Sequence, residues 1–550
     1  MKLDPRNFDA LHFAGIAAAQ MGQLEEGEAL IRRALEINPR NAAAQGNHGS
    51  ALMRLNRHED ALASLERAIA LDPNRANAHQ NRGVTLMRMK RLKDSVAAFD
   101  RAIALTPDNA EAHNDRACAL MDQHKLEDAL AGFEKALSLR PGSSEFLANK
   151  ALVLCALQRP IEALEAADAA LLGKPNDTSA LIARTQALLA LGRPMDGLST
   201  IDRALKIKPT LAEVHIWHST TLIMLGRPEE ALLAAETART LAPKDASAHR
   251  GYGFALGNLN RLEEAMVSYD HALKLQPDDR EAHWNRALAL LALGRFEDGW
   301  LAYEHRNLRH KTLAARKYPK PLWWGKQPLT DQRLYIYWEQ GLGDTIHFSR
   351  YALLAAAAGA KVAFSVQDPL LRLFKGFHSA ITVIGQNEAP TEFDLHCPLM
   401  SLPLAFGTRL ETIPAFEKGY LKAPAEETAR WDQRLPKGQR RIGLVWSGSQ
   451  MHANDSNRSV PLAKLLPLFQ KADVWVSLQK EVRDADRAAL EASGIMDVSA
   501  ELGDFADTAA LIASLDLVIS VDTSVAHLAG ALGKPTWVML PFAPDFRWLL

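Results

Sequence analysis

The chain has 550 residues, enough for several folding units of about 150 residues each, and its 64 Lys and Arg nearly balance 65 Asp and Glu, which excludes the basic field of nucleic-acid-binding proteins. Three widely spaced cysteines, Cys118, Cys155 and Cys397, exclude a disulfide framework and favour a reducing compartment. Because no stretch is long and apolar enough to span a membrane and the first residues lack a signal-peptide core, we expect a cytoplasmic protein.

Prolines recur every 34 residues in the first part of the chain, at positions 5, 39, 73, 107, 141, 175, 209, 243 and 277. From Ala34 onward an alanine stands five residues before each proline, as close packing of successive helices requires. This pattern resembles the tetratricopeptide repeat, in which helical pairs stack into a superhelix. It predicts a solenoid of about nine repeats over residues 1–312, whose last repeat departs from the pattern at Gly299, Trp300 and Arg306, as a docking repeat would.

A column of short polar residues follows the same period in the first helices of five repeats: Asn47, Asn81, Asp115, Asn149 and Asn285. It looks like the asparagine ladder of O-GlcNAc transferases, which implies that Asn47, Asn81, Asn149 and Asn285 bind the backbone of a peptide on the concave face. A merely solvated helix face would give the same column, and several repeats interrupt it. Both interpretations stay open.

Histidines at 79, 113, 215, 249 and 283 also stand at repeat spacing. Residues one repeat apart are separated by about two helix diameters, so they cannot share a metal ion, and we interpret these histidines as packing groups. Residues 313–332 form a linker with prolines and the pair Trp323 and Trp324. Tryptophans in a linker usually bury against both flanking domains, so we expect a rigid join.

From residue 333 strand-like and helix-like segments alternate, which predicts parallel sheets. The first half, residues 333–425, opens on a strand followed by Gly341-Leu342-Gly343-Asp344, where the glycines would let the backbone turn tightly before a helix. The second half, residues 426–550, opens on a strand that leads into a polar loop with Ser449 and Arg458. Its later strands end at Gln479-Lys480 and at Asp522, after which Thr523 or Ser524 would cap a helix.

Two motifs carry a family resemblance: the glycine loop, and the later run with Asp522-Thr523-Ser524, His527 and Gly533-Lys534-Pro535. They resemble heptosyltransferase-type glycosyltransferases of the GT-B fold over about residues 330 to 550. The resemblance implies two halves that close over a nucleotide-sugar, the second holding the nucleotide and the first the acceptor. The fusion to repeats is also similar to O-GlcNAc transferases. The expected fold is therefore an all-α tetratricopeptide superhelix followed by an α/β GT-B-like pair of Rossmann-like domains.

The resemblance implies that Asp344 is the general base that accepts the acceptor's proton, with inversion at the anomeric carbon. The residues expected to bind the nucleotide-sugar and its phosphates are Gly341, Gly343, Ser449, Arg458, Gln479, Lys480, Asp522, Thr523, Ser524 and His527. Amides at the start of the helix would favour the charge of the leaving diphosphate. Five of these residues also have a structural interpretation: Asp344 and Asp522 as helix caps, His527 as a space filler, and Gln479 and Lys480 as solvated groups.

Asp484 and Asp486 have the look of a metal-binding acid pair, but Arg483 and Arg487 flank them, so we interpret them as a solvated, charge-paired helix face. We therefore expect no metal and no cofactor, with the nucleotide-sugar as substrate and a protein or peptide acceptor presented by the repeats.

Two other functions stay open. One is a repeat scaffold for protein–protein interaction whose α/β part is not catalytic. The other is a dinucleotide-dependent dehydrogenase, although Ile346 stands where the third glycine of that fingerprint would be. The first residues, 2–5, resemble the tail of a repeat and the last, 546–550, are apolar, so we expect a fragment with an incomplete second half.

Overall fold

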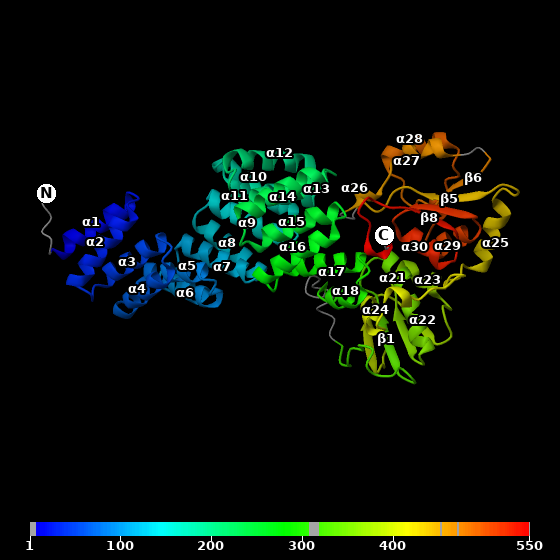
Figure 1. Ribbon diagram of the computed structural model, residues 1–550, viewed down its shortest axis with the longest axis horizontal. Coiled ribbons are helices and arrows are strands. Elements are labelled where there is room, and N and C mark those ends of the chain that lie inside the picture. The colour runs from blue at the N-terminus through cyan, green and yellow to red at the C-terminus, as the bar shows by residue number, and fades with distance from the viewer. Residues whose placement is uncertain (1–6, 307–317, 451–453, 470–471, 549–550) are drawn as a thin grey trace. The chain divides into compact units, whose positions relative to one another are not determined.

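The computed structural model describes residues 7–306, 318–450, 454–469 and 472–548 (Figure 1). The chain divides into two compact units, residues 1–221 and 222–550, and the division falls within helix α13 (Ala212–Met224). Parts of the predictions for both ends of the chain and for the linker, at residues 2–5, 313–317 and 549–550, lie outside the described residues.

The first unit is built from helices that pack in chain order. Asn41, Asn109 and Asp177 each accept a hydrogen bond from the third amide of the helix that they precede, as N-caps do. The alanines of the 34-residue period, such as Ala68 and Ala102, have no exposed surface, so no larger side chain fits there. The helices are α1 (Phe8–Gln20), α2 (Leu24–Ile37), α3 (Ala42–Arg54), α4 (His58–Leu71), α5 (Ala76–Arg88), α6 (Leu92–Leu105), α7 (Ala110–Asp122), α8 (Leu126–Leu139), α9 (Ser144–Ala156), α10 (Pro160–Gly173), α11 (Thr178–Ala190), α12 (Pro194–Ile207) and α13.

The periodic histidines have a more specific role than packing. His79 Nε2 donates to the carbonyl oxygen of Pro73 at 2.9 Å, and His215 Nε2 donates to that of Pro209 at 2.7 Å. The same bond joins His113 to Pro107, His249 to Pro243 and His283 to Pro277. Gln45 Nε2 makes the equivalent bond to Pro39. Each histidine therefore ties a first helix to the turn that precedes it.

The second unit begins with the remaining repeat helices and continues into two sheets. Its repeat helices are α14 (Pro228–Leu241), α15 (Ala246–Asn258), α16 (Leu262–Leu275), α17 (Arg280–Ala292) and α18 (Phe296–Tyr303). In the described part of the chain each sheet has four strands, all parallel, in the orders β3-β2-β1-β4 and β6-β5-β7-β8. This architecture confirms the predicted fold class, a tetratricopeptide solenoid followed by a GT-B-like pair of Rossmann-like halves.

The first sheet, drawn in yellow-green in Figure 1, consists of β1 (Arg333–Tyr337), β2 (Lys361–Ser365), β3 (Ile381–Ile384) and β4 (Leu395–Pro398). Its connections contain α21 (Leu342–Phe348), α22 (Arg350–Ala357), the 3₁₀ turn η1 (Asp368–Leu370), α23 (Leu371–Phe374), η2 (Leu399–Ser401), α24 (Leu402–Ala405) and η3 (Leu410–Thr412).

The second sheet, in orange and red, consists of β5 (Arg441–Val445), β6 (Val474–Ser477), β7 (Leu517–Val521) and β8 (Thr536–Met539). Around it lie α25 (Ala425–Arg434), α26 (Asp455–Arg458), α27 (Leu462–Leu465), η4 (Leu466–Leu468), α28 (Asp484–Ser493), η5 (Ser499–Glu501), α29 (Phe505–Ala513), α30 (Ser524–Ala531) and η6 (Phe546–Trp548).

One apolar core joins the last repeat to both sheets. Trp300 and Tyr303 of α18 are 4% and 1% exposed and pack edge-on against Phe546, and Trp300 also packs against Phe348. The same cluster includes Ile336 of β1 and residues of β7. The departure of this repeat from the pattern therefore coincides with burial against the sheets.

The linker tryptophans differ from each other. Trp323 is 3% exposed and packs against Phe406, whereas Trp324 is 41% exposed. The expectation that both are buried is therefore wrong for Trp324.

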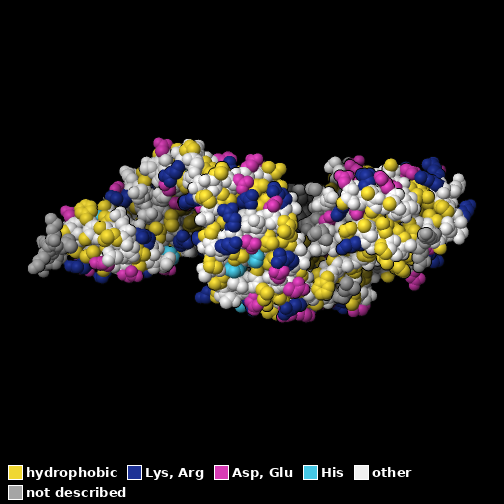
Figure 2. Space-filling view, turned by 90° about the horizontal axis from the view of Figure 1, so that it is seen from above, with side chains coloured by type: hydrophobic (Ala, Val, Ile, Leu, Met, Phe, Trp, Pro, Cys, Tyr) yellow, Lys and Arg dark blue, Asp and Glu magenta, His cyan; other side chains and the backbone are white. Residues whose placement is uncertain are grey.

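None of the described helices combines the length and the apolar character that crossing a membrane requires. The face seen in Figure 2 carries Lys and Arg interspersed with Asp and Glu, as the balanced composition predicts.

Candidate functional site

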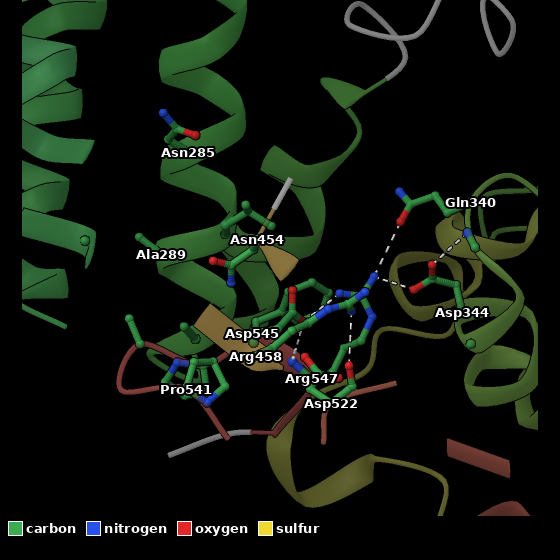
Figure 3. A pocket seen from close by; sticks show the side chains of 18 of the residues that line it. Asn285, Ala289, Gln340, Asp344, Asn454, Arg458, Asp522, Pro541, Asp545 and Arg547 are labelled. Atoms are coloured by element: carbon green, nitrogen blue, oxygen red, sulfur yellow. Dashed lines mark hydrogen bonds and ion pairs between the residues drawn. The ribbon is translucent and has the colours of Figure 1, made fainter. Parts of the chain in front are cut away.

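The two strand-to-helix junctions predicted from the sequence line the same cavity. Asp344, in the first turn of α21, and Thr523, which precedes α30, both border a cavity of about 650 Å³. Figure 3 shows Asp344 and, from the second half, Arg458 and Asp522 around it. The repeat helices α15, α16 and α17 form another wall of it, and residues 541 and 543–547 complete it. All of these walls belong to the second compact unit.

Of the two glycines of the first junction, Gly343 is needed for close approach to the facing helix. Neither Gly341 nor Gly343 has a positive φ angle. A Cβ atom on Gly343 would lie 3.1 Å from His527 Cδ2 and 3.2 Å from Ser524 Cα, so α21 and α30 touch at this glycine. The expectation that the glycines are needed for a backbone turn is therefore wrong. At Gly343 a side chain is excluded because α30 lies too close.

Both oxygens of Asp344 are engaged. Oδ1 pairs with Arg547 Nη2 at 2.5 Å, and Oδ2 accepts from the backbone amide of Gly341 at 2.9 Å. Arg547 also pairs with Asp545 at 2.6 Å. Burial opposes the charge of Arg547, but Asp344 and Asp545 outweigh it and hold its pKa well above the ordinary value. The carboxylate of Asp344 is therefore fixed in direction by a permanent cation.

The second half contributes Arg458 and the start of α30. Arg458 Nη1 donates to the carbonyl oxygen of Asp522 at 3.1 Å, while its buried Nε has no partner among the described residues. Burial lowers the pKa of Arg458 from its ordinary value. Thr523 is at the N-cap, yet its hydroxyl pairs with Ser520 and no side chain caps the helix. Thr523 therefore occupies the predicted N-cap position without capping the helix through its side chain, and the start of α30 borders the cavity together with Ser449.

His527 is buried in an aromatic stack. Its ring lies 4.9 Å from that of Trp548 at an interplanar angle of 9° and packs against His347 at 4.9 Å. Burial, assisted by the charge of Arg547, lowers the pKa of His527 to about 4. Burial and then His527 lower the pKa of His347 well below its ordinary value. Both imidazoles are therefore neutral at pH 7.

Three carboxylates and two guanidinium groups line the described part of the cavity: Asp344, Asp522, Asp545, Arg458 and Arg547. Burial, and secondly the charge of Asp545, raise the pKa of Asp522. The wall formed by the repeats is apolar by contrast, with Phe254, Trp284 and Leu288. The cavity therefore combines a charged side and an aromatic side.

Gln479 and Lys480 do not border this cavity. Gln479 is 7% exposed and bonds both the amide and the carbonyl of Ser447, so it ties the end of β6 to the end of β5. Lys480 Nζ donates to the carbonyl oxygen of Gly503 at 2.6 Å. The structure therefore separates these two residues from the other predicted nucleotide-sugar ligands.

Asp486 was expected on a solvated face, and that expectation is wrong. Its side chain is buried, accepting from the indole of Trp446 at 3.0 Å and from the amide of Leu462 at 2.9 Å. Only Asp484 is exposed and lies near Arg487. Asp486 therefore fixes the start of α27. Among the described residues no group of three His, Cys, Asp or Glu side chains is arranged to hold a metal ion.

Of the asparagine column, Asn285 lines the cavity, on α17. The other three lie in the first unit. Asn47 bonds the ring of His12 at 3.0 Å, Asn149 donates to Asn114 at 3.0 Å, and Asn81 is partly buried. Bonds between neighbouring repeats therefore already engage two of these side chains.

Sequence reasoning missed several lining residues: Tyr303, Gln340, Asn454, Asp545 and Arg547. The apolar run at 546–550 was a signal of burial, but nothing in the sequence indicated that Arg547 within it would face Asp344.

Comparison with known proteins agrees with this architecture. The model of glycosyltransferase family 9 (heptosyltransferase) matches residues 462–538, a span that contains Asp522 to His527 but not Asp344 or Arg547. Tetratricopeptide repeat models match residues 12–76, 47–110 and 110–143, and a further repeat model matches residues 258–294.

Protein FlbA of Caulobacter vibrioides is 25% identical over 245 residues, which cover 39% of this chain and 40% of that protein. The chain thus spans less than half the length of this curated relative. Among solved structures, a tetratricopeptide repeat protein from Parabacteroides merdae is 16% identical with a TM-score of 0.40, covering 45% of this chain and 98% of that one. A thermophilic repeat protein of Thermus thermophilus is 23% identical with a TM-score of 0.32, covering 33% and 99%. The chain joins tetratricopeptide repeats to a glycosyltransferase family 9 (heptosyltransferase) domain near the end of the sequence given.

Proposed function

We propose that this protein transfers a sugar from a nucleotide-sugar to an acceptor, a protein or peptide presented by the repeats. The observation that carries the proposal is the single cavity bordered by Asp344, Thr523 and Asn285. A glycosyltransferase needs a place for the leaving diphosphate, a base for the acceptor and protection from water. In this proposal Thr523 marks the wall for the diphosphate, Asp344 is the base, and Asn285 marks the repeat wall that helps to exclude water.

The donor diphosphate lies against the start of α30 in this proposal. Support comes from the amides after Thr523, which no side chain caps, and from the half-buried Arg458, whose Nε has no partner among the described residues. Charge on a leaving diphosphate grows as its bond to the anomeric carbon breaks, so fixed donors at this place stabilise the transition state more than the ground state.

Asp344 takes the acceptor's proton. The acceptor oxygen attacks the anomeric carbon, the bond from that carbon to the diphosphate breaks, and the hydroxyl proton passes to the carboxylate with inversion. Arg547 and the Gly341 amide support this role, since they hold Asp344 in one orientation. No metal ion takes part in the proposed reaction, because Arg458 and the helix amides supply the charge that the diphosphate needs.

Asn285 and the apolar wall of α15 to α17 support an acceptor that arrives along the repeats. The backbone of an extended peptide offers partners to the amide of Asn285, and the aromatic side chains of this wall suit its apolar side chains.

The test is turnover of a panel of UDP-, GDP-, ADP- and CMP-sugars by the full chain and by Asp344→Asn. Loss of a general base predicts a fall in kcat of about 10²- to 10⁴-fold with folding intact. Asp484→Asn, which changes an exposed aspartate of the same unit, is the matched control. Equal turnover by Asp344→Asn and the unmodified chain would refute the role of Asp344.

A scaffold function is the second candidate, because Asp344 is already paired with Arg547. Titration calorimetry with UDP, GDP, ADP and CMP separates the two functions. A transferase gives heat with one of them, and a scaffold gives none.

A further inference from the structure

The loop that leads to Asp344 is held by the end of the last repeat. Glu339 lies in this loop between β1 and α21, and its carboxylate accepts from Arg306 Nη2 at 2.9 Å and from Arg306 Nε at 3.3 Å. The side chains of both residues are 0% exposed. The amide of Met400 also donates to Glu339, at 2.9 Å. A carboxylate so deeply buried depends on its cation, since an unpaired buried charge is costly.

Gln340, the next residue, makes a second connection. Its Nε2 donates to the hydroxyl oxygen of Tyr303 at 2.8 Å, and its Oε1 accepts from Arg547 at 3.4 Å. Its carbonyl oxygen accepts from Gln367 at 2.9 Å. Tyr303 is itself fixed, because its ring is 1% exposed and packs against Trp300 and Phe546.

Two consecutive loop residues are thus bonded to two residues at the end of the repeats, and Asp344 follows in the first turn of α21. We infer that Tyr303 and Arg306 are positioning residues for the transfer reaction, so the last repeat is part of the transfer site. This inference rests on the proposed function. It assigns to the repeats a role in placing the base, in addition to presenting the acceptor.

Small displacements of a base are costly, because a misplacement of about 1 Å lowers a rate by about 10²-fold. Tyr303→Phe removes one hydroxyl and leaves the buried ring in place. We expect kcat to fall by about 10-fold, with the KM for the donor unchanged, since the loop moves and Arg458 and α30 do not.

The experiment measures kcat, KM and thermal unfolding of the full chain with whichever nucleotide-sugar of the panel the unmodified protein turns over. Tyr351→Phe is the matched control, since Tyr351 is also buried and its hydroxyl donates to Thr408 at 3.0 Å, away from the loop. Arg306→Lys keeps the charge but loses the paired geometry, and a fall in kcat is expected. If that variant does not fold, Tyr303→Phe decides.

A double-mutant cycle with Gln340→Leu separates positioning from general stabilisation. If Tyr303 acts through Gln340, the double variant is no slower than Gln340→Leu alone, whereas additive losses overturn the inference. Turnover by Tyr303→Phe within two-fold of the unmodified protein also overturns it. Absence of turnover by the unmodified protein with every donor refutes the proposed function instead.

Discussion

The role of Arg547 depends on the side chains that surround it. It pairs with Asp344 and Asp545 while its guanidinium lies 4.6 Å from the centre of the Phe546 ring. Removing it would leave two carboxylates facing each other across a largely buried site, where their repulsion is poorly screened. The ion pair therefore sets the direction of the proposed base.

Arg547→Met tests that dependence. Without the cation Asp344 Oδ1 loses its partner and the carboxylate is no longer held in one orientation, so kcat should fall by about 10-fold or more. The measurement is kcat for the turned-over donor. Arg487→Met, at an exposed arginine of α28, serves as control, and an unchanged kcat in Arg547→Met contradicts the pairing.

His527 predicts a pH dependence of stability. Its pKa falls from 6.5 to about 4 on folding, so the unfolded chain takes up a proton between these values while the folded chain does not. Stability contributed by the neutral ring is complete above pH 6.5 and is lost as pH falls toward 4, by about 3 kcal/mol. In His527→Phe this part of the loss should disappear from urea unfolding curves measured between pH 7 and 4.

His378→Gln provides the comparison, because His378 is exposed. A variant at 527 that loses stability with pH as steeply as the unmodified chain would show that another group is responsible.

At the scale of elements, the contact of α21 with α30 explains Gly343. Gly343→Ala would force a Cβ to within about 3 Å of Ser524 and His527, and overpacking of this kind costs about 1–3 kcal/mol. Gly341→Ala should cost much less, because its φ of −68° suits any residue and only Asp344 Oδ2 lies near. Urea unfolding of the two variants gives the comparison, and equal losses would contradict the contact.

The bonds from histidine to the proline carbonyl make a second prediction at this scale. His79→Leu removes one such bond, and we expect a loss of about 1 kcal/mol in the free energy of unfolding. Leucine is a fair replacement, since Leu147 and Leu181 occupy the equivalent position in other repeats. His215→Leu should add independently, because distant repeats interact only through their neighbours. If the losses in the free energy of unfolding of the two variants were strongly coupled, the two histidine bonds would not be independent.

The elements and their order could be predicted because each has a local signature. The 34-residue proline period and its alanines specify the solenoid, and the parallel strands follow from the alternation after residue 333. The junctions at Asp344 and Thr523 could be predicted because parallel strands end at one edge. The partners could not, since the Asp344–Arg547 pair joins residues 203 apart in sequence and Asp486 has the same local pattern as a solvated acid.

At the scale of the molecule, the repeats and the α/β domain are separate in sequence but are packed together. Trp300, Tyr303 and Arg306 belong to the core of the sheets. A fragment of residues 222–550 should therefore fold, whereas 318–550 should not, because it exposes that core and leaves Glu339 unpaired at a cost of about 3–5 kcal/mol. Circular dichroism and thermal unfolding distinguish them, and a cooperative transition for 318–550 would contradict the shared core.

The contact at Gly343 also bears on how a ligand arrives. The first and second halves already touch there, at the wall of the cavity, so they cannot swing together much further when a substrate binds. Entry is then governed by small rearrangements of side chains at the rim, and binding should be accompanied by little change in the radius of gyration of the protein.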